Sequence, residues 1–342
     1  MDTRRDLQSA DMHASDMKEV PLTRLEGVFV GNAQDDEAAT GVTVILFPQG
    51  AAVGVDVSGG GPASRESALL SPLTAPTPVN AIVLSGGSAY GLAASDGVMH
   101  WLEEHGIGFD TGVALVPIVV QSCLYDLSYG KSDIRPDAAM GRAACVAAWK
   151  RQAVKMGSFG AGTGATVGKL RGMRRAMKAG LGMYALEHKG LVMAAIVAVN
   201  ALGDIYEERT NQKIAGLLTP DRSAYIDTCT EWHSLSAAPG TNLFTACNTT
   251  IGAVLTNARF DKAQLTKLAS MTRNAYARCI RPVGTLADGD TIYAASLGKI
   301  STDLNVAGMM SVEVMSEAIR RAITSSRIDD EVYLARCLPK ES

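Results

Sequence analysis

The sequence predicts a mixed α/β or α+β sheet protein rather than a helical bundle, and two patterns carry that prediction. Short runs rich in β-branched and other apolar residues recur along the chain, as is typical of buried strands. Several of these runs are separated by longer segments in which apolar residues repeat at helical spacing. With 342 residues, of which 47% are hydrophobic and 20% charged, the chain is large enough for two domains or for one large sheet-based domain.

The first 24 residues are predicted to form a peripheral N-terminal arm, because residues 1–20 are polar and lack the alternation of a strand. Two β-branched runs follow at 42–47 and 52–57, and the residues between them, Pro48-Gln49-Gly50, favour a turn. This spacing predicts a β-hairpin. The run Gly59-Gly60-Gly61-Pro62 then ends the second strand candidate.

Strand and helix patterns alternate through the middle of the chain. The expected elements are a buried strand at 80–84, a helix at 89–105, a strand at 113–120, an Ala-rich helix at 136–150, a Gly-rich loop at 157–168 and a central strand at 191–199. The last of these is apolar throughout and is closed by Asn200. A chain that alternates in this way builds layers of helices on sheets.

Residues 207–245 show no clear period and are predicted to form a long surface excursion, and a loop of that length is usually functional or mobile. Regular patterns return beyond it. The expected elements are a strand at 249–255, a helix at 261–280, a strand at 291–295 and an amphipathic helix around 312–323. Asp261 and Gln264 form a capping pair at the start of the first helix.

Charge and cysteine usage exclude several partners and cofactors. The formal net charge is −3 and no block of like charge is long enough to bind a phosphate backbone, so we expect no nucleic-acid partner. The longest apolar run is too short to cross a bilayer, and residues 1–20 lack the apolar core of a signal peptide; we therefore expect no membrane partner and a cytoplasmic location. The six cysteines include no CxxC pair, so neither a metal site nor a disulfide framework is expected.

Three familiar motifs are approached but not matched. The Gly-rich run at 160–169 is not a Walker A loop, because position 163 is Thr and position 170 is Leu. His100 and His105 are five residues apart and so do not share the helix face that a zinc-protease pair requires. Residues 86–90 approach a nucleophile elbow, but the fifth position is Tyr where the sharp turn requires Gly. A glycine turn that leads into a helix is the favoured interpretation.

Two polar clusters directly precede apolar strand candidates. Asn248-Thr249-Thr250 stands before the first and Asp288-Gly289-Asp290 before the second. Both place reactive groups at the start of a strand. From the residues alone the interpretation stays open, because Asp-Gly-Asp is also a common turn.

Eight ordered blocks of sequence resemble the self-processing L-aminopeptidase/D-esterase family, to which β-peptidyl aminopeptidases and nylon-oligomer endohydrolases belong. The blocks together span about residues 25–325 and lie at 41–48, 55–60, 81–92, 96–99, 124–127, 164–169, 248–251 and 288–291. The peptide-cleaving branch has a Ser nucleophile and a Ser/Glu pair where this chain has Thr249 and the pair Asp288 and Asp290. The chain therefore looks most similar to the threonine-nucleophile, nylon-oligomer-endohydrolase-like members.

This resemblance implies a single domain at 25–342, a four-layer αββα sandwich similar to N-terminal-nucleophile hydrolases but with different connectivity. It also implies an inactive precursor that cuts itself between Asn248 and Thr249 into an α chain, 1–248, and a β chain, 249–342. A homo-oligomer, a tetramer of αβ heterodimers, is implied as well. No metal and no cofactor are implied.

By the same resemblance, Thr249 is the nucleophile, and the α-amine that cleavage exposes serves as its base. Such an amine has a pKa of about 7.7–8.0, so no histidine is required. The implied catalytic residues are Thr249, Asn200, Lys169, Tyr125, Asp288 and Asp290. In these roles Tyr125 and Asn200 face the reacting carbonyl, Lys169 adds a charge, and the two aspartates hold the nucleophile and its amine.

The leading hypothesis is thus a self-processing N-terminal-threonine amidohydrolase, either an aminopeptidase or an amide-oligomer hydrolase, that acts on a small amide or peptide through an acyl-enzyme. One alternative is an acyltransferase that passes the acyl group to an amine, related to ornithine acetyltransferase. Another is a non-enzymatic binding protein whose Gly-rich loop binds small anions. The substrate, its stereochemistry, and cleavage from an end or internally stay open at this point.

Overall fold

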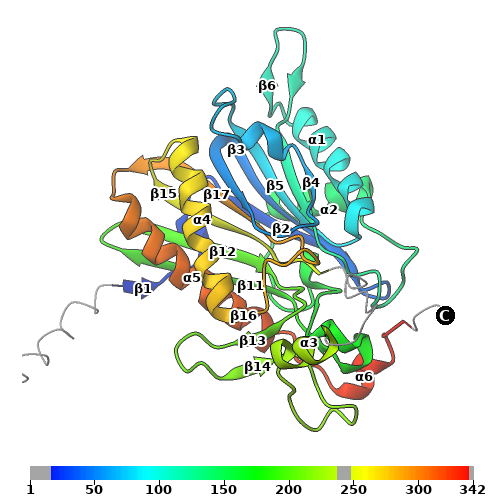
Figure 1. Ribbon diagram of the computed structural model, residues 1–342. Helices are drawn as coiled ribbons and strands as arrows, with labels where there is room; N and C mark the ends of the chain where they lie inside the picture. Colours follow the sequence, from blue (N-terminus) through cyan, green and yellow to red (C-terminus); the bar gives the residue numbers. More distant parts are fainter. Residues whose placement is uncertain (1–16, 237–247, 339–342) are drawn as a thin grey trace, which may run out of the picture.

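The computed structural model describes residues 17–236 and 248–338, and they form four layers in the order helices, sheet, sheet, helices (Figure 1). Ten strands form one continuous ladder in the order β1-β11-β12-β15-β17-β3-β5-β8-β4, with β2 paired to β3. These strands are β1 (Met17–Glu19), β2 (Phe29–Asp35), β3 (Thr40–Val57), β4 (Ala63–Arg65), β5 (Val79–Ser85), β8 (Val119–Cys123), β11 (Leu181–His188), β12 (Leu191–Ala198), β15 (Ile251–Ala258) and β17 (Thr291–Ile300). The predicted αββα sandwich is confirmed.

Strand β3 connects the two sheet layers. Its residues 42–46 pair with β5, its residues 52–57 pair with β17, and the register shifts between Leu46 and Ala51. Pro48-Gln49-Gly50 therefore form an irregularity within one 18-residue strand, and the predicted hairpin is wrong. Gly50 does have the positive φ of a turn residue, +76°. The three residues bend the strand but do not reverse it, because each half of the strand pairs with a different neighbour.

The core of the described residues has three large parts, one at each contact between layers, and a small fourth cluster around Tyr129 and Tyr333. Strand β12 shows this best: Val192, Ala194 and Ile196 face the core between the sheets, while the alternate residues, such as Met193, face the helices. This two-sided burial explains why the strand is apolar at every position. The predicted central strand is confirmed.

Helices α4 and α5 cover one sheet, and α1 and α2 cover the other (Figure 1). Their bounds are α1 (Ala94–Glu104), α2 (Ala138–Trp149), α4 (Lys262–Cys279) and α5 (Leu304–Thr324). Each corresponds to a predicted helix. Asp261 caps α4 in a complete capping box with Gln264, as the sequence predicted.

The polar segments depart further from prediction. The strand expected at 113–120 is divided at Pro117 into β7 (Leu115–Val116) and β8, because proline has no N–H to donate to a ladder. The excursion expected to be irregular holds β14 (Lys213–Ala215) and α3 (Thr228–Ser236), and its residues 237–245 lie outside the described residues. β14 joins β13 (Asp204–Tyr206) and β16 (Ile280–Arg281) in a small sheet.

The remaining short strands and one short α-helix lie in loops. They are β6 (Phe109–Asp110), which pairs with β7, and β9 (Thr166–Val167), β10 (Met177–Lys178) and α6 (Asp330–Leu334). At the start of the described chain, Met17–Glu19 of the predicted arm pair with β11, and residues 1–16 lie outside the described residues. None of the helices in the described ranges is long and apolar enough to span a membrane.

Candidate active site

The strand order brings three polar segments together at one end of the central strands. Asn200 follows β12, while the clusters 248–250 and 288–290 precede β15 and β17. β12 runs antiparallel to β15, and β15 runs parallel to β17, with Ile251 in register with both Ala198 and Thr291. The end of β12 and the starts of the other two strands must therefore coincide. Segments far apart in the sequence meet because of this strand order.

The peptide bond between Asn248 and Thr249 is buried and held from both sides. The Thr249 hydroxyl donates to the Asn248 carbonyl oxygen, and the Gly289 N–H donates to the same oxygen at 2.8 Å. The Thr249 N–H donates to the carbonyl of Asn200 at 3.0 Å, and the Asn248 N–H donates to that of Ala287 at 3.1 Å. Thr249 is 5% exposed and Asn248 is 1% exposed. A hydroxyl thus lies beside a carbonyl whose oxygen accepts two hydrogen bonds.

The turn that carries Gly289 packs tightly against Thr249 and against the glycine run at 59–61, and both sides of this contact require glycine. A Cβ at Gly289 would lie 2.8 Å from the Thr249 hydroxyl oxygen, and a Cβ at Gly59 would lie 2.4 Å from the carbonyl oxygen of Asp288. The Gly61 N–H donates to that carbonyl at 2.8 Å, and the Gly59 N–H donates to the carbonyl of Asp290 at 3.2 Å. The glycine run that the sequence marked only as a breaker is therefore the surface on which the acidic turn rests.

Asp288 and Asp290 are both buried and receive hydrogen bonds from neighbouring main chain. Thr285 donates to one oxygen of Asp288 through its N–H, at 2.9 Å, and through its hydroxyl, at 2.6 Å. Asp290 accepts from the N–H groups of Thr250, at 2.6 Å, and Gly284, at 2.9 Å. Thr285 and Gly284 are positioning groups that the sequence did not reveal, since neither stands in the Asp-Gly-Asp cluster.

The pKa values of both carboxyls are raised. For Asp288 the main cause is burial, which the hydrogen bonds from Thr285 oppose. For Asp290 burial and then the charge of Asp288 raise the pKa to about 7, against the hydrogen bonds from Thr250 and Gly284. Lys169 lowers the pKa of both. Asp290 can therefore change its protonation near neutral pH.

Asn200 and Lys169 form a second polar layer next to Thr249. The Lys169 ammonium donates to both oxygens of Asn200, main chain and side chain, at 2.9 Å each. The Asn200 side-chain oxygen also accepts from the Thr166 N–H at 3.0 Å, and its amide donates to the carbonyl of Tyr125 at 2.8 Å. Tyr125 therefore enters this network through its main chain. An oxyanion role for Tyr125 and Asn200 stays a prediction, and the main-chain donor placed on the Asn248 carbonyl is Gly289.

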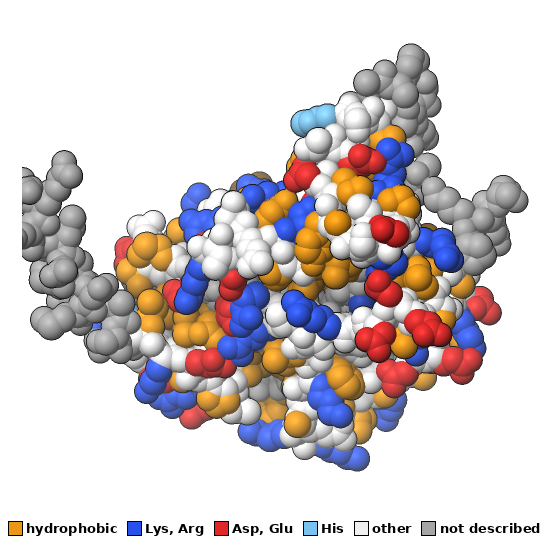
Figure 2. Space-filling model, turned by 90° about the horizontal axis from the view of Figure 1, so that it is seen from below, with side chains coloured by type: hydrophobic (Ala, Val, Ile, Leu, Met, Phe, Trp, Pro, Cys, Tyr) orange, Lys and Arg blue, Asp and Glu red, His pale blue; other side chains and the backbone are white. Residues whose placement is uncertain are grey.

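The structure thus brings Thr249, Asn200, Lys169, Asp288 and Asp290 together through hydrogen bonds or neighbouring charges, with Tyr125 beside Asn200. In the described ranges, no group of three or more His, Cys, Asp or Glu side chains is placed to hold a metal ion. On the face shown in Figure 2, Lys and Arg side chains are interspersed with Asp, Glu and hydrophobic ones.

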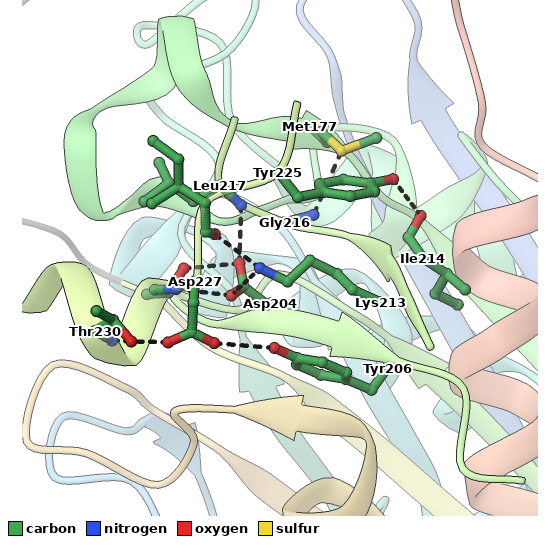
Figure 3. Close-up of polar contacts among 12 residues, drawn as sticks. Met177, Asp204, Tyr206, Lys213, Ile214, Gly216, Leu217, Tyr225, Asp227 and Thr230 are labelled. Atoms are coloured by element: carbon green, nitrogen blue, oxygen red, sulfur yellow. Dashed lines mark hydrogen bonds and ion pairs between the residues drawn. The ribbon is translucent and has the colours of Figure 1, made fainter. Parts of the chain in front are cut away.

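A different buried aspartate lies four residues beyond Asn200 (Figure 3). Asp204 forms an ion pair with Lys213 at 2.6 Å and accepts hydrogen bonds from the Leu217 N–H and from both the N–H and the hydroxyl of Thr228. These partners belong to the excursion that the sequence predicts without regular structure. Asp204 therefore anchors the start of α3 and β14 to β13, next to the site.

Four layers with a polar site at the strand ends define the class: the fold is that of the N-terminal-nucleophile-like hydrolases. The chain belongs to peptidase family S58, whose family model matches residues 21–329. It is 38% identical over 294 residues to an uncharacterised aminopeptidase of Mycobacterium leprae, covering 82% of this chain and 79% of the relative. It is 31% identical over 309 residues to a 6-aminohexanoate-oligomer endohydrolase of Kocuria sp., covering 86% and 84%.

Among solved structures, the L-aminopeptidase D-Ala-esterase/amidase of Ochrobactrum anthropi superposes with a TM-score of 0.64 at 17% identity, over 91% of this chain and 93% of that one. At this identity the likeness concerns the fold. The family resemblance predicted from the sequence blocks is confirmed. Membership and these relatives support a hydrolase of amide bonds.

Proposed function

We propose that this protein is a self-processing amidohydrolase whose nucleophile is Thr249, exposed as an N-terminal residue by cleavage after Asn248. The observation that carries the proposal is the contact of the Thr249 hydroxyl with the Asn248 carbonyl, whose oxygen also accepts the Gly289 N–H. A donor already placed on a carbonyl oxygen stabilises the negative charge that grows there during attack.

Self-cleavage proceeds in two steps. The Thr249 oxygen attacks the carbonyl carbon of Asn248, the C–N bond breaks, and the hydroxyl proton passes to the nitrogen, which leaves an ester and a free amine. Water then hydrolyses the ester to the carboxylate of Asn248 and regenerates the hydroxyl. Thr249 now carries its own base, the α-amine, beside its hydroxyl.

The buried charges around the nucleophile suit Thr249 as an N-terminal residue with a free amine. Asp290 is bonded to the N–H of the next residue, Thr250, and ionised carboxylates near an amine favour its protonated form. Lys169 supplies the opposite charge and, through Asn200, lies beside the Thr249 N–H. In this proposal the acid pair holds the amine, and Lys169 and Asn200 fix its position.

Intact-mass measurement of the purified protein tests the proposal. We expect two chains, 1–248 and 249–342, and we expect Thr249→Ala to stay as one chain. Thr249→Ser keeps a hydroxyl and is the matched control that should still be cut. An uncut wild-type chain that hydrolyses amides at full rate would contradict the mechanism.

The substrate class that fits is a linear amide or peptide, because the relatives are named as an aminopeptidase and an oligomer endohydrolase. We also propose that the processed protein assembles as a homotetramer of αβ heterodimers. Light scattering of the processed protein tests the assembly, and a monomeric mass would contradict it.

A further inference from the structure

The ester formed during self-cleavage is chemically an acyl-enzyme. It carries an acyl group on the Thr249 oxygen and a free amine on the same residue, as the turnover intermediate of an amide substrate does. The acyl residue in the first case is Asn248. The position of Asn248 therefore shows where the acyl residue of a substrate lies, provided that Thr249 is the nucleophile as proposed above.

The main chain at 287–289 holds Asn248 as a neighbouring strand would. Asn248 forms a parallel bridge with Asp288, in which its N–H donates to Ala287 at 3.1 Å and its carbonyl accepts from Gly289 at 2.8 Å. Both contacts involve only main-chain atoms on the enzyme side. The contact with Ala287 requires an acyl residue whose α-carbon carries an N–H, which is an α-amino acyl group, whereas the contact with Gly289 requires only the carbonyl.

The nitrogen of Asn248 is itself part of a peptide bond, because the chain continues to Cys247. The contact with Ala287 thus forms with an acylated nitrogen and does not need a free ammonium. A substrate whose α-nitrogen is acylated can make the same contact. Such a substrate is cut within a chain, not only at its amino end.

We propose that residues 287–289 form the acyl subsite of this enzyme, which binds an α-amino acyl residue in extended conformation and accepts acylation of its nitrogen. This inference rests on the proposed function and names its substrate class. An ω-amino acyl group does not fit the two contacts, because its nitrogen is several bonds further from the reacting carbonyl.

Four anilides that differ only in the acyl group test the subsite on the processed enzyme. They carry N-acetyl-asparaginyl, asparaginyl, succinamoyl, which is asparaginyl without its α-nitrogen, and 6-acetamidohexanoyl. We expect the N-acetyl compound to exceed the succinamoyl and hexanoyl compounds in kcat/KM by about three- to tenfold, the effect of one hydrogen bond. Uncut Thr249→Ala, which should hydrolyse none of them, is the control for contaminating activity.

The outcomes separate the two proposals. Hydrolysis of asparaginyl anilide without that of its N-acetyl form would overturn the acyl subsite and leave the self-processing hydrolase standing. Equal rates for the N-acetyl and succinamoyl compounds, faster hydrolysis of the hexanoyl compound, or no hydrolysis of any anilide by processed enzyme would also overturn the subsite. A wild-type chain that stays uncut in the intact-mass measurement would remove the proposed function itself.

Discussion

Two buried carboxylate sites lie close together in this molecule and are compensated in different ways. Asp204 faces an ammonium, that of Lys213, and accepts three further hydrogen bonds. Asp290 accepts two N–H groups and has a second carboxylate, Asp288, as its neighbour. Burial alone therefore does not define a reactive site. The acidic site differs in that its two carboxylates lie beside each other, accept hydrogen bonds from N–H and hydroxyl groups, and share the charge of one lysine, Lys169.

The difference assigns separate tasks to the two sites. A buried charge with a matched partner costs stability when the partner is removed. A carboxylate next to another carboxylate has a raised pKa, and for Asp290 burial and then the charge of Asp288 raise it to about 7. We therefore expect changes at Asp204 to act on folding and changes at Asp290 to act on chemistry.

Substituting Asp204→Ala should have the largest effect on stability. It leaves Lys213 without its ion-pair partner in a largely buried place, and breaking such a pair typically costs about 3–5 kcal/mol. Asp227→Ala is the control in the same cluster, because Asp227 is exposed and bonds mainly to Thr230. Urea denaturation measures both. A loss at Asp204 no greater than that at Asp227 would contradict the anchoring role.

Asp290→Asn should instead affect self-cleavage. We expect the rate to fall about 10- to 100-fold, as for loss of a hydrogen bond to a charged group that positions the neighbour of the nucleophile, while the free energy of unfolding at pH 8 falls less than in Asp204→Ala. The small change in stability follows because the substitution also removes a charge that is costly to bury. Intact mass over time gives the rate. An equal loss of folding in both variants would remove the contrast between the two sites.

The sequence predicts one of these sites far better than the other. Asp288 and Asp290 stand in a short cluster directly before a strand, and a family resemblance points to them. Asp204 has no such signal, because its partners Lys213, Leu217 and Thr228 lie 9, 13 and 24 residues away in a segment without hydrophobic period. Contacts of that kind depend on tertiary structure.

The same distinction holds for the fold. The period and caps of α4 and the apolar run of β12 are local signals, and both elements are predicted correctly. The predicted hairpin at 42–57 is wrong because the first half of β3 pairs with β5 and the second half pairs with β17. Which strands pair depends on tertiary structure, and the local sequence does not show it. At the site, Gly289 acts through its main-chain N–H, which donates to the Asn248 carbonyl. Every residue except proline has such a group, so the sequence does not single out Gly289 for this role.

The raised pKa of Asp290 predicts how stability depends on pH. An unfolded Asp has a pKa near 3.9, and the folded value is about 7, so the unfolded chain ionises first as pH rises. This group should therefore lower the free energy of unfolding by up to about 1.4 kcal/mol per pH unit between pH 4 and 7, with no further loss above. Denaturation of wild type and Asp290→Asn across this range measures the term. A pH dependence as steep in Asp290→Asn as in wild type would show that the term does not come from Asp290.

The smallest effect should come from Thr285→Val, which removes the hydroxyl that donates to Asp288 at 2.6 Å but keeps the shape of the side chain. Without that donor the ionised form of Asp288 is less favoured, so its pKa should rise further. We expect self-cleavage to slow by about fivefold at pH 6.5, an effect of about 1 kcal/mol, and by less at pH 8.5, because a higher pH favours the ionised form of Asp288. Thr285→Ser restores the hydroxyl and should restore the wild-type profile. A uniform slowing at both pH values would mean that Thr285 supports only the shape of the turn, because a purely structural loss does not depend on the protonation of Asp288.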